Sequence, residues 1–266
     1  MPIQISVEIV VNELIRLRAL NPLVHVLTNE VVQEITANVL LAIGASPAMV
    51  VAEEEVEPFV AVSQALLVNI GTLYPARLQT MQKAISAANK NDVPWTLDPV
   101  AVGNALDYRT EVCQELLLCK PAVIRGNASE ILALAGDTSG GRGVDSTACS
   151  EAALEAAEGL ARKTGSIVAV TGETDFITDG ETTWATPWGH PVMTRVVGTG
   201  CALSALVAAF TAQAPNRLNA VAAACAVAGL CGERAAAASS GPGSFKANFL
   251  DALYLLTPEQ IQKQTK

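Results

Sequence analysis

The feature that most constrains the fold is an alternation of short apolar runs with longer segments of helical periodicity. In the first cycle, apolar residues recur with helical spacing over 5–20, Pro22 closes that segment, and the apolar run 23–27 follows. Such short runs predict buried strands, and spacings of three and four predict helices. Because strands that alternate with helices usually pair in parallel, we expect an α/β fold with a mostly parallel central sheet and helices on both faces.

The same cycle continues to the end of the chain. Further strands are predicted at 46–51, 65–70, 95–97, 122–124 and 167–171, with a hairpin made by 176–178 and 182–185. Further helices are predicted at 30–43, 56–63, 75–89, 108–119, 128–134, 146–163 (capped by Ser146), from Cys201 onward, 218–238 and 245–256. Residues 137–145 are expected to form a loop. Since no linker interrupts the pattern, we expect residues 1–266 to form a single domain.

Composition and charge narrow the classes of partner. Half of the residues are hydrophobic and 16% are charged, so a large core is available. The net charge is −9 and no run of Lys or Arg occurs, which argues against nucleic acid. The most apolar segments, around 201–213 and 219–232, are each shorter than the roughly 20 residues of a membrane span. We therefore expect two buried helices and no membrane partner.

The cysteines indicate a reducing compartment. There are six, without a C-x-x-C pair or a metal-binding spacing. Most lie in apolar helical runs, where a buried free thiol is the ordinary state. No signal-peptide pattern begins the chain. We expect a cytoplasmic protein.

The ends of the predicted strands carry a polar, glycine-rich set of residues. Ligands of open α/β sheets bind beyond the carboxyl ends of the strands. Those ends carry Thr28-Asn29, Met49, Gly71, Asp98, Arg125-Gly126-Asn127, Thr171-Gly172 and Gly198-Thr199-Gly200-Cys201. Such a set could hold a phosphate and a metal ion.

The turn Gly198–Cys201 leads from an apolar pair into a helix. Unpaired N–H groups at a helix start suit a phosphate, and they would favour the thiolate of Cys201. The simpler alternative is a tight loop before a core helix.

Two acidic residues also have two interpretations each. Asp98 precedes Pro99 and is either a turn former or a site carboxylate. Glu130 stands three residues after Asn127, as in a capping box. Glu130 and Asp98 could also organise Mg²⁺ through water, because Mg²⁺ uses few carboxylates.

Arg125 ends an apolar strand, where a guanidinium needs a partner. A nucleotide phosphate is suitable, and a structural salt bridge is the alternative. Thr171, at the end of another strand, could add a hydroxyl group to a phosphate site.

Several nucleotide-binding and hydrolase patterns are absent. Neither G-x-G-x-x-G after a strand nor the P-loop pattern occurs. The two histidines, His25 and His190, and the lack of G-x-S-x-G argue against Ser-His-Asp hydrolysis. His25 lies within an apolar strand and is expected to be a core histidine. A Cys–His hydrolase that uses Cys201 stays open.

Six stretches together resemble one known family. They are 21–29 (NPLVHVLTN), 36–49, 98–103 (DPVAVG), 124–130 (IRGNASE), 170–172 (VTG) and 198–201 (GTGC). In this order they resemble the hydroxyethylthiazole kinases of the ribokinase-like superfamily, and they span nearly the whole chain. Cys201 stands where most of that superfamily has Asp.

The resemblance implies transfer of the γ-phosphate of ATP to the hydroxyethyl group of 4-methyl-5-(2-hydroxyethyl)thiazole. It implies Met49 and Gly198 at the thiazole with Asn29 and Gly71 beside them, Arg125 and Thr171 at ATP, and Asp98 and Glu130 around Mg²⁺. It also implies a homotrimer with substrate pockets at the subunit boundaries.

Phosphoryl transfer depends mainly on positioning and charge neutralisation. We therefore expect the Gly198–Gly200 turn to hold the transferring group. Cys201 is expected to position the substrate first and to act as a base second. The rivals are another ribokinase-like enzyme, such as a hydroxymethylpyrimidine kinase or an ATP/ADP-dependent repair dehydratase, and a catalytically silent thiazole- or nucleotide-binding protein.

Overall fold

The computed structural model describes residues 1–103, 106–136 and 146–264, with only the backbone for 146–151. The strands are β1 (Ile3–Gln4), β2 (Leu23–Leu27), β3 (Ser46–Ala48), β4 (Ala65–Asn69), β5 (Trp95–Asp98), β6 (Val123–Asn127), β7 (Ile167–Thr171), β8 (Asp175–Thr178) and β9 (Thr183–Thr186). The α-helices are α1 (Val7–Leu20), α2 (Gln33–Ile43), α3 (Val56–Val62), α4 (Pro75–Lys90), α5 (Asp107–Leu117), α6 (Ala128–Ala135), α7 (Ser146–Thr164), α8 (Thr199–Thr211), α9 (Arg217–Ala237), α10 (Pro242–Leu255) and α11 (Pro258–Gln264). Two short 3-10 helices are η1 (Glu30–Val32) and η2 (Pro191–Arg195).

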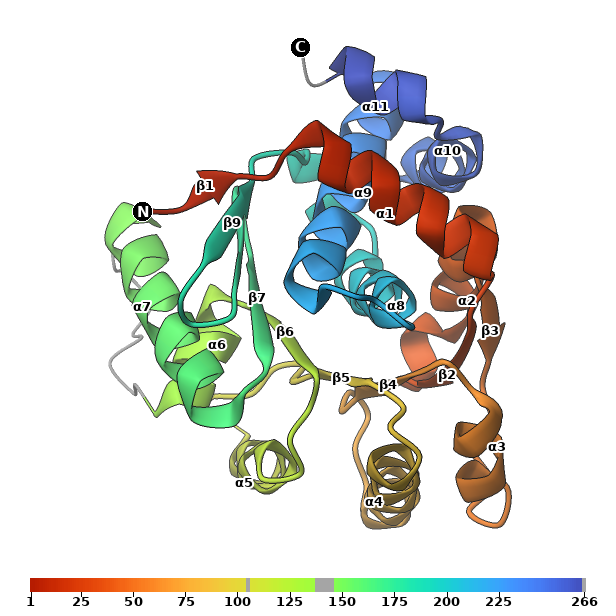
Figure 1. Ribbon diagram of the computed structural model, residues 1–266, viewed down its shortest axis with the longest axis vertical. Helices are drawn as coiled ribbons and strands as arrows, with labels where there is room; N and C mark the ends of the chain where they lie inside the picture. Colours follow the sequence, from red (N-terminus) through yellow and green to blue (C-terminus); the bar gives the residue numbers. More distant parts are fainter. Residues whose placement is uncertain (104–105, 137–145, 265–266) are drawn as a thin grey trace.

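Within the described residues the strands form one sheet in the order β1-β9-β8-β7-β6-β5-β4-β2-β3. The strands run parallel except for β8, which is antiparallel to both of its neighbours. Helices cover both faces of this sheet (Figure 1). The predicted α/β architecture with a mostly parallel sheet is confirmed.

The two faces of the sheet bury separate cores because strand side chains alternate. In β4, Ala65 and Leu67 join the core under α1, α2, α8, α9, α10 and α11. Leu66 and Val68 join the core under α3, α4, α5, α6 and α7. A strand buried on both faces has no polar alternation, which explains the continuous apolar run in its sequence.

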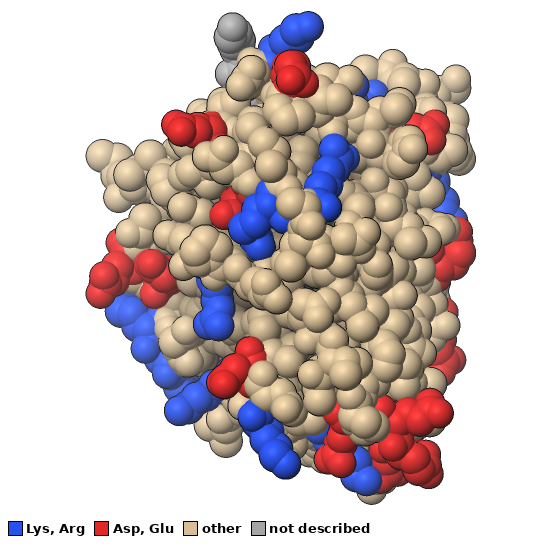
Figure 2. All heavy atoms as spheres, turned by 45° about the vertical axis from the view of Figure 1, so that its right-hand side comes forward, with Lys and Arg blue, Asp and Glu red and all other residues tan. Residues whose placement is uncertain are grey.

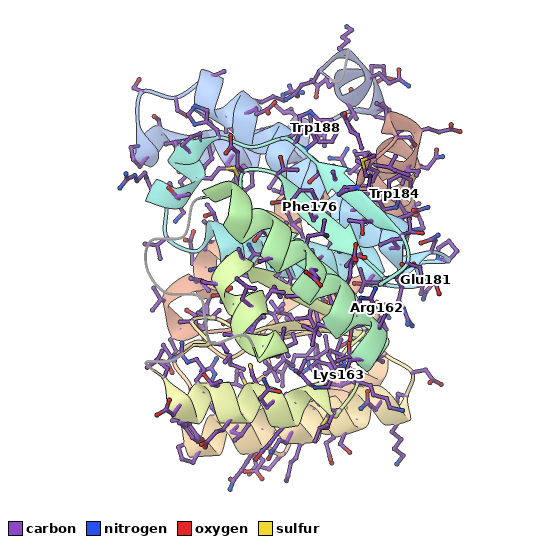
Figure 3. The ribbon with its side chains drawn as sticks, turned by 90° about the vertical axis from the view of Figure 1, so that its left-hand side faces the viewer. Arg162, Lys163, Phe176, Glu181, Trp184 and Trp188 are labelled. Atoms are coloured by element: carbon purple, nitrogen blue, oxygen red, sulfur yellow. The ribbon has the colours of Figure 1, made fainter. Side chains whose placement is uncertain are left out.

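The predicted hairpin of β8 and β9 is confirmed, and α7 packs beside it. Figure 3 shows Arg162 of α7 near Glu181, which lies in the turn between the two strands. Nη1 of Arg162 donates to the carbonyl of Gly180 at 2.7 Å. This hydrogen bond ties the hairpin turn to the helix that precedes β7.

The two apolar segments predicted to be buried helices are α8 and α9, and both lie in the core. By length and composition, α9 is the one helix of the described part that could cross a membrane. Its most apolar window is 78% buried in this fold, under α1, α8 and α10. It is a core helix here.

Some predicted boundaries are wrong. The strand predicted at 46–51 ends at Ala48, and the helix predicted from residue 30 begins with the 3-10 turn η1. The two-residue strand β1, the 3-10 helix η2 and the last helix α11 were not predicted. The loop expected at 137–145 lies outside the described residues, as does the side chain of Ser146.

Candidate active site

The candidate site lies where the carboxyl ends of β2, β4, β5, β6 and β7 meet the start of α8. Register brings Asn69 beside Asp98 and Asn127 beside Thr171 on neighbouring strands. The first two turns of α8 reach the same place, because Ser204 hydrogen-bonds to Asp98 at the end of β5 and Gly200 to Arg125 of β6. The expected meeting of polar strand ends is therefore present in the fold.

Asp98 is the buried carboxylate of this site, with 1% of its surface exposed. Its Oδ2 accepts hydrogen bonds from Nδ2 of Asn69 at 2.7 Å and from Oγ of Ser204 at 2.8 Å. Burial raises the pKa of Asp98 to about 6, although Arg125 and the two hydrogen bonds act to lower it. The charge of Glu130 raises this pKa further.

Glu130 forms the predicted capping box at the start of α6. Asn127 accepts the backbone N–H of Glu130, and Oε2 of Glu130 accepts the N–H of Asn127 at 2.8 Å. The other oxygen, Oε1, accepts the N–H of Ala101 at 2.9 Å. The structural interpretation of Glu130 is confirmed, and its carboxylate is held in one orientation next to the loop that follows Asp98.

Arg125 joins β6 to both β7 and α8. Its Nη1 donates to the carbonyl of Gly200 at 3.0 Å, and its Nη2 donates to Oγ1 of Thr171 at 2.5 Å. No carboxylate of the described residues lies within 4.0 Å of it, so the expected alternative of a structural salt bridge is not realised there. Its buried Nε finds no partner within the same residues. This guanidinium keeps donor capacity for an anion.

The start of α8 requires glycine at position 198 and leaves little room for a side chain at position 200. Gly198 is left-handed, with φ +90°, and a Cβ there would lie 2.7 Å from Cγ2 of Ile35 and 2.9 Å from Cγ1 of Val32. A Cβ on Gly200 would lie 3.2 Å from Nη1 of Arg125. The turn thus packs against η1 and α2 on one side and the guanidinium on the other, and the first N–H groups of α8 face outward.

Replacing Gly198 with alanine is expected to lower the free energy of unfolding by about 2–4 kcal/mol, because strain at positive φ adds to overpacking. Urea unfolding of Gly198→Ala would measure this. The matched control is Gly159→Ala in α7, where a Cβ meets no atom within 4 Å and φ is not left-handed. That control should be neutral or stabilising by about 1 kcal/mol. Equal stabilities for the two variants would contradict the expectation.

Cys201 occupies the third position of α8 and is half-buried. Asn29 donates to its Sγ through Nδ2 at 3.5 Å. Burial and the charge of Asp98 raise the pKa of the Cys201 thiol, and the amides of Asn69 and Asn29 only partly offset this. The expectation of a favoured thiolate is therefore wrong for this environment, because burial is the largest influence on the pKa and raises it.

The two histidines do not form a Cys–His pair. Nε2 of His25 lies 2.8 Å from the carbonyl oxygen of Val50, and His25 is fully buried against Phe59. His190 accepts the N–H of Val192 through Nδ1 and begins η2. Among the described residues neither ring hydrogen-bonds to Cys201, so a Cys–His hydrolase loses its base.

The residues predicted for the acceptor pocket lie at one end of the sheet. Asn29 follows β2, Gly71 follows β4, and the N–H of Gly71 donates to Oδ1 of Asn69 at 3.0 Å. Met49 follows the edge strand β3, is half-buried, and has no polar link to this network. The structure brings Asn29, Gly71 and Cys201 together, whereas Met49 lies farther along the sheet edge.

Two members of the site were missed in the sequence. Asn69 and Ser204 are both fully buried, and both hydrogen-bond to Asp98. Asn69 is the only polar residue in the run Ala65–Ile70, a signal like the one that singled out Asp98. Ser204 stands in an apolar helix, and its orientation toward the sheet depends on tertiary packing.

Comparison with known proteins agrees with this geometry. Residues 14–259 match the family model described as the hydroxyethylthiazole kinase family. A hydroxyethylthiazole kinase of Serratia proteamaculans is 60% identical over 242 residues, which are 91% of each chain. The solved hydroxyethylthiazole kinase of Pyrococcus horikoshii has a TM-score of 0.89 at 39% identity, over 96% of each chain. A ribokinase-like protein of Enterococcus faecalis, at 16% identity and a TM-score of 0.67 over 98% of this chain and 95% of its own, shares the fold. The fold is ribokinase-like, and the chain belongs to the hydroxyethylthiazole kinase family.

Proposed function

We propose that this chain, as one domain over residues 1–266, transfers the γ-phosphoryl group of ATP to the hydroxyl oxygen of 4-methyl-5-(2-hydroxyethyl)thiazole. Family membership supports the reaction class. The observation that carries the proposal is the bridge from Arg125 to Gly200 and Thr171, beside the buried carboxylate of Asp98. The guanidinium of Arg125, the start of α8 and the carboxylate of Asp98 thus lie together.

The ATP phosphates are assigned to Arg125, Thr171 and the Gly198–Gly200 turn. The guanidinium is held by two hydrogen bonds, so little side-chain entropy is lost when a phosphate binds. The N–H groups at the start of α8 add the positive end of the helix dipole. Donors already in place suit phosphoryl transfer, whose loose transition state spreads negative charge over the phosphoryl oxygens.

Asp98 and Glu130 fit a Mg²⁺ ion that is held largely by water and phosphate. No group of three or more His, Cys, Asp or Glu side chains suited to a metal occurs in the described residues. Mg²⁺ ordinarily needs only one or two carboxylates beside substrate phosphates. Glu130 raises the pKa of Asp98, so the two carboxylates repel each other and a cation close to both would be favourable. When bound, the ion would neutralise phosphate charge.

The acceptor is assigned to Asn29, Gly71, Met49, Gly198 and Cys201. In the reaction, a bond forms between the hydroxyl oxygen and the γ-phosphorus, the bond from that phosphorus to the bridging oxygen of ADP breaks, and the hydroxyl proton is released to water. Cys201 is a protonated thiol at neutral pH, because burial raises its pKa. Positioning of the acceptor is therefore its first role.

One assay tests the proposal against the rival activities. The purified protein is incubated with ATP and Mg²⁺ and with thiazole alcohol, hydroxymethylpyrimidine or no acceptor, while ADP and phosphorylated product are followed by coupled spectroscopy and mass spectrometry. We expect ADP and thiazole phosphate in equal amounts, and turnover with thiazole alcohol far above the other two reactions. A folded, ATP-binding protein that leaves the thiazole unphosphorylated would be a silent binder or a kinase of another alcohol.

We also propose a homotrimer whose substrate pockets lie at subunit boundaries. Exposed apolar residues surround the edge strand β3: Val31 on η1, Leu41 on α2, Val51 after β3, and Val62 at the end of α3. Figure 2 turns this side forward and shows a broad area without charged side chains, above a group of acidic ones. An exposed apolar area beside an unpaired strand edge favours burial against another copy.

Light scattering should give three times the mass of one chain. Leu41→Glu, on α2, is expected to shift the mass toward one chain, because it would bury a charge in the interface. The matched control is Leu118→Glu, on the far side of the sheet after α5, which should leave the mass unchanged. A wild-type mass of one or two chains would overturn the trimer.

The proposed compartment is the cytoplasm. The five cysteines whose side chains are described are all free thiols, and three of them are buried. Free thiols persist in reducing compartments, which also supply ATP.

A further inference from the structure

Asn69 links the acidic side of the site to the acceptor side. It ends β4 and is 0% exposed. Its Nδ2 donates to Oδ2 of Asp98 at 2.7 Å, and its Oδ1 accepts Nδ2 of Asn29 at 3.1 Å. Asn29 in turn donates to Sγ of Cys201 at 3.5 Å. The four side chains form one continuous hydrogen-bonded chain from a carboxylate to a thiol.

Backbone N–H groups fix the direction of every bond in this chain. Oδ1 of Asn69 accepts the N–H of Gly71 at 3.0 Å, and Oδ1 of Asn29 accepts the N–H of Val31 at 3.2 Å. A backbone N–H can only donate, so each contact identifies the amide oxygen. The NH₂ group of Asn69 therefore faces Asp98, and the NH₂ group of Asn29 faces Asn69 and Cys201.

This polarity defines what the thiol can do. Both hydrogens of the Asn29 amide are used, one on Asn69 and one on the sulfur, so Sγ is an acceptor toward the protein. The S–H hydrogen of Cys201 is then available for a molecule in the acceptor pocket. If the Asn29 amide were reversed, the thiol would instead donate to its oxygen.

We propose that Asn69 is a positioning residue that orients Asn29, so that the thiol of Cys201 directs its S–H toward an acceptor molecule bearing an oxygen or nitrogen lone pair. The inference rests on the proposed function for the identity of that acceptor, a small alcohol. The amide of Asn69 also lowers the pKa of Cys201 directly. Asn69 therefore acts on the acceptor side both through Asn29 and by itself, a role that its place at the end of β4 does not reveal in the sequence.

Ser204 provides an internal comparison. It donates to the same oxygen of Asp98 at 2.8 Å, but it comes from α8 and has no bond to Asn29. Loss of Ser204 should therefore disturb Asp98 alone, whereas loss of Asn69 should disturb Asp98 and Asn29 together. The difference between the effects of the two variants therefore reports on Asn29 and Cys201, the acceptor end of the hydrogen-bonded series.

The test compares Asn69→Ala with Ser204→Ala and with the folding control Asn89→Ala. Asn89 bonds to Cys119 and Trp95 at the opposite end of the sheet, so its loss should lower the Tm without touching the site. Asn69→Ala is expected to raise the KM for thiazole alcohol about tenfold, while the KM for ATP changes by less than about twofold. Asn89→Ala should leave the thiazole KM within about twofold of wild type. Ser204→Ala, which disturbs Asp98 alone, should lower kcat rather than raise the thiazole KM tenfold.

Alkylation of Cys201 gives a readout without any substrate. Iodoacetamide labelling is followed by mass spectrometry of the peptide that contains Cys201, over a range of pH. Because the amides of Asn29 and Asn69 lower the pKa of this thiol, Asn69→Ala should shift its alkylation profile to higher pH and slow the reaction about tenfold near pH 8. Asn89→Ala should not shift the profile.

Wild-type activity and labelling keep the two hypotheses apart. If wild type does not phosphorylate the thiazole but Asn69→Ala still shifts the labelling, the proposed function fails and the hydrogen-bonded chain stands. If Asn69→Ala behaves like Asn89→Ala in both readouts, the inference is overturned. If Asn69→Ala does not fold, the isosteric Asn29→Asp takes its place: it keeps the acceptor for Val31 but cannot donate to Cys201, and an unchanged labelling profile would equally overturn the inference.

Discussion

Replacing Asp98 with asparagine is expected to lower kcat by about 10²–10³-fold while making the folded protein more stable at neutral pH. The loss of activity follows from the loss of the buried carboxylate proposed to face Mg²⁺ and the phosphates. Asparagine has the same shape, and its Oδ1 can accept the bonds from Asn69 and Ser204 that Oδ2 accepts in wild type. Packing and hydrogen bonds should therefore be kept.

The gain in stability follows from the pKa of Asp98, which is raised from 3.8 to about 6 by burial. A raised pKa means that the folded state binds the proton more tightly than the unfolded chain does. The contribution of this group is thus fully favourable below pH 4 and is lost as the pH rises through about 6. At neutral pH the buried charge costs on the order of 3 kcal/mol, and Asp98→Asn removes that cost.

Urea unfolding at several pH values, combined with steady-state kinetics, would check both halves of this expectation. Wild type should lose stability relative to Asp98→Asn between pH 4 and 7. The matched control is Asp175→Asn, because Asp175 is also buried with a pKa raised to about 6 and lies at the start of β8. That variant should gain stability and lose far less of kcat. An Asp98→Asn enzyme that keeps wild-type kcat would remove Asp98 from the proposed chemistry.

The strand ends show why much of this site could be predicted from the sequence. Asp98, Arg125 and Thr171 each follow or end a run of apolar residues, and parallel strands bring such ends to one edge of the sheet. Order along the chain was therefore enough to group them. The capping box of Glu130 was equally local, since it depends on residues three positions apart.

Other features depend on contacts that sequence order does not specify. The apolar run predicts a strand over 65–70, which places Asn69 inside it. In the structure Asn69 is the last residue of β4 and hydrogen-bonds to Asp98, a contact that the run does not indicate. The pKa of Cys201 depends on how deeply α8 is buried between α2, α9 and the sheet, which the glycine turn does not reveal. The short strand β1 is the first strand along the chain, yet among the described residues it pairs with β9, the last one.

Arg125 is expected to be the largest single contributor to ATP binding. It is 9% exposed, and its charge lowers the pKa of Asp98, Asp175 and Cys201, all of which burial raises. Removing the charge of Arg125 therefore removes the cation that lowers all three of these pKa values. It also removes both guanidinium hydrogen bonds, which tie β6 to α8 and to β7. Among the described residues, Arg125 is the one cation that acts on Asp98, Asp175 and Cys201 alike.

Two substitutions separate the charge of Arg125 from its geometry. Arg125→Met keeps the length and loses the charge, and we expect the KM for ATP to rise by about 100-fold or more, with a loss of about 3 kcal/mol of stability. Arg125→Lys keeps the charge but reaches one partner at a time, so the KM for ATP should rise by about tenfold. Isothermal titration with ATP and urea unfolding measure the two effects.

The matched control is Arg162→Met, on α7, whose side chain holds the β8–β9 turn through Gly180 and is half exposed. It should lower stability slightly and leave the KM for ATP unchanged. Equal ATP affinity in Arg125→Lys and wild type would mean that charge alone is used, because a lysine cannot reproduce the planar pair of bonds. Unchanged affinity in Arg125→Met would exclude Arg125 from the nucleotide site, and the phosphates would then be held by the helix start and the metal.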